Sequence, residues 1–163
     1  MELKTRRVVH TAVTSSPTDE WTAQQLREAT PWGKAPKYLI HDRDSKYGHR
    51  FSKVATSSGI KELKTPFRAP KADVPKVRAY SERFIGTLRR ECLDHVLVLH
   101  RNHLHRLVAR FVDYYNRARP HQGIQQRIPD RFDQDLHPPS GKVVSMPVLG
   151  GLHHSYTCVA NLN

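Results

Sequence analysis

The sequence predicts an α/β fold built on a parallel sheet. Three segments rich in apolar or β-branched residues alternate with two amphipathic segments, in the order strand, helix, strand, helix, strand. The 163 residues fall within the usual size of a single domain, and a hydrophobic share of 37% is enough for a modest core. We therefore expect one folded domain followed by a tail.

The first half of the chain supplies the alternating elements. A strand is expected over Arg7 to Thr14, because β-branched residues alternate there. A helix follows the capping cluster SPTD, places apolar residues at helical spacing up to Ala29, and stops at Pro31-Trp32-Gly33. The remaining expected elements are a strand over Lys37 to His41, a helix over about His49 to Ser57 and a strand over Ile60 to Leu63.

The second half of the chain is predicted to be helical after a basic loop. Thr65 to Val77 contains three prolines and three basic residues, so we expect a mobile loop that is neither helix nor central strand. A helix over Ala79 to Cys92 is expected to place Phe84, Ile85, Leu88 and Cys92 on one face. A second helix carries apolar residues from Leu104 to Tyr115 at i, i+3, i+4, i+7, i+8 and i+11, and ends before Pro120.

The composition excludes several classes of protein. The 27 lysines and arginines against 15 acids give a formal charge of +12, which points to a polyanion partner. No apolar run reaches the roughly 18 residues of a membrane span, and the first residues lack the apolar region of a signal peptide. Two cysteines without metal-ligand spacing argue against a disulfide scaffold and a zinc site. We expect a reduced, cytoplasmic chain.

Two acids are candidates for chemistry. Asp42 follows a predicted strand, and ligands of parallel sheets bind in the crevice beyond the carboxyl ends of the strands. Glu82 lies on a predicted helix among arginines and follows the basic loop. Taken separately, each has an ordinary structural explanation, namely a turn or helix cap for Asp42 and an ion pair within the helix for Glu82.

Several linked motifs carry a resemblance to a known family. In order they are LIHDRDSKYG, KTPFRAPKA, AYSERFIGTLRRECLDHVLVL and FVDYYNRARPHQGI. The chain resembles the integrase core domain of bacterial insertion-sequence transposases, which are relatives of retroviral integrases. The resemblance implies a ribonuclease-H-like three-layer α/β fold with a mixed sheet that lacks its first strand. It also implies a partial catalytic core over residues 1–129 and a C-terminal tail over residues 130–163, where the sequence has room for one hairpin.

The resemblance assigns roles to both candidate acids. Asp42 and Glu82 fall on the second and third acids of the family's DDE triad, whose carboxylates hold two Mg²⁺ or Mn²⁺ ions for phosphodiester cleavage and strand transfer. Here 39 residues separate them, more than is usual in the family, and the excess falls in the loop PKADVPKVRAYSERF. The first aspartate of the triad has no counterpart in this chain. We therefore expect little or no strand transfer by this chain alone.

The basic residues predict contact with DNA. Between Pro66 and Ile128 thirteen basic residues stand against five acids, and arginine, which binds phosphate in a forked geometry, dominates. The resemblance implies transposon ends and target DNA as partners. The candidate DNA-binding residues are Arg68, Lys71, Lys76, Arg78, Arg89, Arg90 and Arg119. For Asn116 and His121, in the YNRARPH segment, capping of the helix that ends before Pro120 explains the pattern equally well.

Two alternatives to a catalytic fragment remain. One is a non-catalytic DNA-binding or interaction module that kept the basic surface after losing the metal site. The other, an RNA-binding protein, is disfavoured because no motif of the common RNA-binding modules is present. Loss of a central strand would expose sheet edges, which a homo-oligomer would cover. The expected location is the bacterial cytoplasm, on the nucleoid when DNA is bound, with no membrane association.

Overall fold

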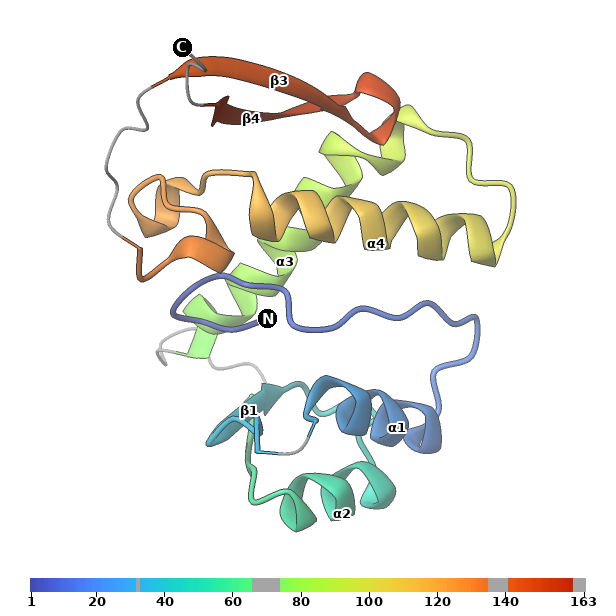
Figure 1. Cartoon of the computed structure of the whole chain (residues 1–163). Coiled ribbons are helices and arrows are strands. Elements are labelled where there is room, and N and C mark those ends of the chain that lie inside the picture. The colour runs from blue at the N-terminus through green and yellow to red at the C-terminus, as the bar shows by residue number, and fades with distance from the viewer. Residues whose placement is uncertain (32, 66–73, 135–140, 160–163) are drawn as a thin grey trace. The chain divides into compact units, whose positions relative to one another are not determined.

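The protein is described here by a computed structural model. The structure describes residues 1–31, 33–65, 74–134 and 141–159, and for residues 74–78 it describes the backbone alone. The described part of the chain contains four α-helices and four strands (Figure 1). It divides into two compact units. One comprises Met1–Thr11 with Arg83–Asn163, and the other comprises Ala12–Glu82.

The unit Ala12–Glu82 contains the alternating elements that the sequence predicts. They are α1 (Asp19–Ala29), β1 (Tyr38–His41), α2 (His49–Ser57) and β2 (Lys61–Lys64). β1 and β2 pair in parallel, with Tyr38 opposite Lys61 and His41 opposite Lys64. The apolar faces of the two helices and the residue before β2 form one buried cluster of Ala23, Leu26, Phe51, Val54, Ala55 and Ile60. The predicted helix, strand, helix, strand order is therefore confirmed from residue 19 to residue 64.

A side chain from α1 caps the start of α2. Gly48 precedes α2 and has no side chain with which to cap it. Asp19 supplies the missing acceptor: Oδ1 accepts from the N–H groups of Gly48 and Phe51 at 3.0 and 2.8 Å, and Oδ2 accepts from Arg50 N–H at 2.8 Å. A carboxylate at a helix N-terminus also interacts favourably with the helix dipole. One acid thus joins the two helices of this unit.

The second unit is built on two long helices. These are α3 (Val74–Glu91), whose last turns belong to this unit, and α4 (Arg101–Arg117), with the short η1 (Leu93–His95) between them. Their apolar stripes form a second buried cluster of Val8, Leu88, Cys92, Val108, Phe111 and Tyr115. Phe111 and Cys92 have no exposed surface, which agrees with the predicted place of Cys92 on the apolar face of its helix. Burial raises the pKa of the Cys92 thiol.

Two details of α3 differ from the prediction. The helix begins at Val74, inside the segment expected to be a loop, because proline at the second helical position needs no hydrogen-bond partner and has the φ of a helix. Ile85 is 54% exposed rather than on the buried face. Leu88 and Cys92 follow Phe84 at intervals of four and share its side of the helix, whereas Ile85 is rotated about 100° away from Phe84.

The predicted strand over Arg7 to Thr14 does not form. The segment has no regular secondary structure and pairs with no strand. Instead the Asn116 side chain of α4 bonds both backbone groups of Val8, with Oδ1 accepting from Val8 N–H and Nδ2 donating to Val8 C=O, each at 2.9 Å. An amide side chain presents the same donor and acceptor as a peptide group, so it takes the place of a neighbouring strand.

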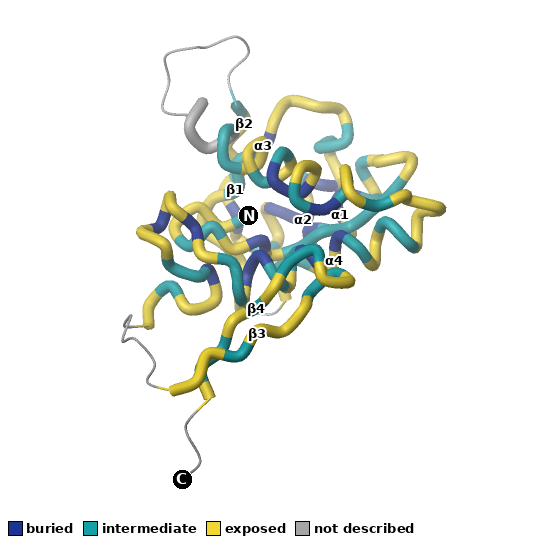
Figure 2. Tube along the Cα trace, turned by 90° about the horizontal axis from the view of Figure 1, so that it is seen from above, coloured by how far each residue is buried: buried dark blue, intermediate teal, exposed yellow. Residues whose placement is uncertain are grey.

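The C-terminal part of the chain contains an antiparallel hairpin. β3 (Lys142–Val148) pairs with β4 (His153–Val159), joined by η4 (Leu149–Gly151) and Leu152. One face is partly covered: His153 forms a hydrogen bond with the backbone oxygen of Glu91 at 2.6 Å and stacks on Tyr114. Figure 2 shows β3 mostly exposed. Two 3-10 turns, η2 (Gln122–Ile124) and η3 (Pro129–Arg131), precede the hairpin.

A search of the described residues for a membrane-crossing helix finds none with the necessary length and apolar character.

Candidate active site and nucleic-acid interface

Asp42 lies directly beyond the carboxyl end of β1, as the sequence predicts. The residue is exposed, and its Oδ1 accepts from the N–H of Asp44 at 3.4 Å. Asp44 serves the following turn: Lys46 Nζ donates to its carboxylate at 2.7 Å, and this hydrogen bond holds the pKa of Asp44 below its ordinary value. Asp44 is therefore engaged by its neighbour, and Asp42 presents the exposed carboxylate at the strand end.

A buried polar network fixes the backbone at Asp42. The side chain of His41 is only 4% exposed, and its two ring nitrogens lie 2.7 Å from the backbone oxygen of Asp42 and 2.9 Å from Glu62 Oε2. Ser52 Oγ donates to the same Glu62 oxygen at 3.1 Å. Tyr47 and Phe51 pack against the His41 ring, with ring centroids 4.7 and 5.4 Å away.

The hydrogen bonds of His41 define where its protons lie. A backbone oxygen can only accept, so Nδ1 of His41 carries a hydrogen toward Asp42. Glu62 faces the other nitrogen, so that hydrogen bond needs a hydrogen on either Nε2 or the carboxyl oxygen. Sequence reasoning missed Glu62 and Ser52, because only the parallel pairing of β1 with β2 brings them to His41. The available signal was an acid in the middle of a predicted strand.

Glu82 lies on α3 and is exposed. It belongs to the same compact unit as Asp42, at the boundary of that unit. Within the described ranges, no group of three or more His, Cys, Asp or Glu side chains is arranged to hold a metal ion. The donor set that the structure describes therefore does not fit a complete two-metal site.

The acids that precede Asp42 have other structural roles. Asp19 caps α2, Glu20 pairs with Arg50 at 3.1 Å, and Glu2 accepts from the Thr5 hydroxyl at 2.7 Å. Gln24 donates to Glu28 within α1 at 3.0 Å. None of these acids lies on a strand, so none occupies a position equivalent to that of Asp42.

The candidate DNA-binding residues fall into three groups. Arg68 and Lys71 lie outside the described residues, and Lys76 and Arg78 lie where only the backbone of α3 is described. Arg89 and Arg90 are exposed in the last turn of α3, where cations also interact favourably with the helix dipole. Arg119 is partly buried and forms two hydrogen bonds with Glu91, Nη2 to Oε1 at 2.6 Å and Nε to Oε2 at 2.9 Å.

The YNRARPH segment closes the end of α4. Asn116 holds Val8, and Arg119 joins α4 to the end of α3 through Glu91. His121 lies 3.1 Å from the backbone oxygen of Tyr115 through Nε2 and 3.2 Å from Arg119 Nη1 through Nδ1. Nε2 must therefore donate and Nδ1 accept, so the buried ring is neutral. Burial lowers the pKa of His121 in agreement with this. His121 bonds a carbonyl near the end of α4, as the capping interpretation anticipates, whereas Asn116 bonds the distant Val8 and does not cap this helix.

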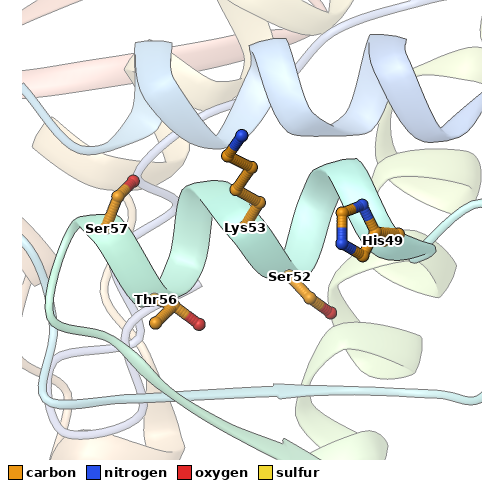
Figure 3. A pocket seen from close by; sticks show the side chains of 5 residues that line it. All are labelled: His49, Ser52, Lys53, Thr56 and Ser57. Atoms are coloured by element: carbon orange, nitrogen blue, oxygen red, sulfur yellow. The ribbon is translucent and has the colours of Figure 1, made fainter.

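A shallow pocket lies along α2 and contains neither candidate acid. Figure 3 shows its lining side chains, all from α2. They are His49, Ser52, Lys53, Thr56 and Ser57. Ser52 is already engaged by Glu62, and a depression lined by one helix has no opposing wall to enclose a ligand.

Comparisons with known proteins agree with the sequence motifs. Residues 67–129, which include Glu82, Arg89, Arg90 and Arg119, match the family model of the integrase core domain. No curated protein matches the sequence. A chain of the cryo-EM structure of a simian T-cell lymphotropic virus intasome in complex with PP2A regulatory subunit B56 gamma is similar in structure, with a TM-score of 0.56 and 15% sequence identity. The similarity covers 88% of this chain and 54% of that one, so the protein spans about half the length of its structural relative.

The comparisons support the predicted fold class. At 15% identity, the structural likeness shows a shared fold, consistent with a ribonuclease-H-like α/β arrangement, whereas the missing first strand stays a prediction. The match of residues 67–129 and the shared fold both support an integrase-like core domain in this chain.

Proposed function

We propose that this protein is the catalytic-core portion of a transposase or integrase that acts on DNA in the bacterial cytoplasm. The observation that carries the proposal is the integrase-core match over residues 67–129, which contains Glu82, together with Asp42 at the end of a parallel strand. Both acids belong to one compact unit. The partners are transposon ends and target DNA, and the intasome relative favours assembly of several copies on DNA.

The chemistry of the family requires divalent metal ions. Mg²⁺ or Mn²⁺ supplies charge neutralisation at the transferring phosphate and activates the attacking oxygen. Asp42 presents an exposed carboxylate oxygen, and the network of His41, Glu62 and Ser52 holds the backbone that carries it. Asp42 and Glu82 are the proposed ligands. Because the described residues contain no group of three potential ligands arranged to hold a metal ion, the proposal includes little or no strand-transfer activity of this chain by itself.

The set of DNA-binding residues is proposed to comprise the basic residues of the loop before α3, of α3 and of the end of α4. Arg89 and Arg90 are its exposed members with described side chains, and their contacts are to phosphate, which gives binding that weakens as salt is raised. Arg119 reaches DNA only if its guanidinium keeps a donor directed away from Glu91, and a guanidinium has five N–H donors.

Binding of a labelled DNA duplex at several salt concentrations tests the proposal. We expect the logarithm of affinity to fall linearly with the logarithm of salt, and Arg89→Gln with Arg90→Gln to reduce that slope by about one for each phosphate that is no longer bound. Arg27→Gln, an exposed arginine on α1, is the matched control and leaves the slope unchanged. A flat salt dependence of the unmodified chain would contradict DNA binding.

The incomplete donor set is the observation that favours the second candidate, a non-catalytic module. Metal and activity measurements separate this candidate from the catalytic fragment. Titration with Mn²⁺ is expected to show a weak site that Asp42→Asn removes and that Asp133→Asn, at an exposed acid elsewhere, does not. Equal Mn²⁺ binding by all three proteins favours the non-catalytic module. Robust Mg²⁺-dependent joining of DNA ends by the purified chain would overturn the proposed lack of activity.

A further inference from the structure

The two most exposed large apolar residues of the described chain, Leu97 and Leu99, lie in one loop. The connection from η1 to α4, yellow-green in Figure 1, contains Leu97, Val98 and Leu99. Leu97 is 80% exposed, Leu99 71% and Val98 39%. Three adjacent apolar residues exposed to water are unfavourable unless a partner covers them, so this tip, residues 97–99, is a candidate interaction site.

Hydrogen bonds hold the tip at both ends. Val96 N–H donates to Leu93 C=O at 3.3 Å, and His95 Nε2 lies 2.8 Å from the backbone oxygen of Arg90. On the other side, Leu99 N–H donates to His103 Nδ1 at 3.4 Å, and His103 N–H donates to His100 Nδ1 at 3.2 Å. Since both rings accept through Nδ1, each carries its proton on Nε2 as a hydrogen-bond donor beside the tip.

The charges around the tip select a polyanion as its partner. Five exposed arginines flank it in sequence, two at the end of α3 and three on α4, and they are Arg89, Arg90, Arg101, Arg106 and Arg110. The acids in the same stretch are Glu91, which Arg119 engages, and Asp94. Two copies that met through this loop would bring their arginines together, which is unfavourable, whereas phosphate groups would be attracted.

We propose that Leu97 and Leu99 form an apolar wedge that enters between adjacent base pairs of duplex DNA while the flanking arginines contact the phosphates on either side. This inference rests on the proposed DNA binding and adds that the bound protein unstacks the duplex locally. Leucine is among the residues that proteins insert between base steps, and the burial of its side chain offsets the unfavourable unstacking. Pyrimidine-purine steps unstack most easily and are the preferred sites.

Fluorescence of 2-aminopurine next to a TA step in a short duplex tests the wedge, because this base brightens when it is unstacked. The unmodified chain is expected to raise the fluorescence. The variant Leu97→Ser with Leu99→Ser is expected to abolish the rise and to weaken binding about three- to tenfold, with an unchanged salt slope. Val143→Ser, at a 61% exposed apolar residue of β3, is the matched control and keeps both signals.

The two levels of the proposal fail in different ways. Absence of any salt-dependent DNA binding by the unmodified chain refutes DNA binding itself. Binding without a rise in fluorescence, or a rise that survives Leu97→Ser with Leu99→Ser, overturns the wedge alone. In a further outcome, this variant retains the fluorescence rise but loses self-association or binding to anionic lipid vesicles. Such a result assigns the tip to another partner and likewise overturns the wedge.

Discussion

Asn116→Ala tests whether the amide clasp on the N-terminal segment stabilises the protein. Asn116 is 6% exposed and Val8 is 5% exposed, so water cannot replace the two missing hydrogen bonds without opening the structure. Each backbone group of Val8 left buried without a partner costs about 1–3 kcal/mol. The two groups together cost at least about 2 kcal/mol, and single substitutions seldom cost more than about 4 kcal/mol, so we expect the free energy of unfolding to fall by about 2–4 kcal/mol.

Urea unfolding followed by circular dichroism measures this change. With a denaturant slope of about 2 kcal/mol/M, the midpoint falls by about 1–2 M. Asn102→Ala, at an exposed asparagine of α4, is the matched control and is expected to change stability by less than about 0.5 kcal/mol. Trypsin adds a local readout, since release of the segment should speed cleavage after Arg6 and Arg7. An Asn116→Ala protein with unchanged midpoint and unchanged cleavage would refute the reasoning.

Three further substitutions probe other contacts. Phe111→Ala empties a site with no exposed surface and is expected to lower the free energy of unfolding by about 3–5 kcal/mol in urea, whereas Tyr156→Ala, at a 68% exposed ring, has little effect. Burial lowers the pKa of His121 below its value of 6.5 in the unfolded chain, so the free energy of unfolding decreases as the pH falls below that value. Between pH 7.5 and 5.5 the His121→Gln variant is therefore expected to lose less stability than the unmodified chain. An equal loss in both proteins would contradict the assignment. Asp19→Ala removes the cap of α2 and is expected to lower the melting temperature more than Glu20→Ala, its exposed neighbour; equal shifts would argue against the cap.

Local signals predict the helices and strands whose determinants are near in sequence. α2 is expected over His49–Ser57 and is found there, because its apolar residues repeat at helical spacing and glycines bound it on both sides. The bounds of β1 and β2 also agree with the predicted strands to within a residue or two. The strand expected at Arg7 to Thr14 does not form because a strand needs a partner, and the partner of Val8 is a side chain that lies far along the sequence.

The candidate site shows the same division. The position of Asp42 beyond a parallel strand follows from the order of elements, and Glu82 follows from a resemblance in its helix. The network of His41, Glu62 and Ser52 could not be predicted, because it requires the register of β1 on β2 and the packing of α2 beside them. The engagement of Arg119 by Glu91 was also unforeseen, since the two are 28 positions apart in the sequence.

The clasp on Val8 has a consequence for the order in which the chain folds. Asn116 follows Val8 by 108 residues, and the intervening unit Ala12–Glu82 has its own buried cluster. During synthesis the N-terminal segment therefore leaves the ribosome long before α4, which carries Asn116. All residues of the unit Ala12–Glu82 leave the ribosome before α4 does. Closure of so long a loop is entropically costly and slow, so docking of residues 1–11 is expected to be a late step that completes a unit assembled from the two ends of the chain.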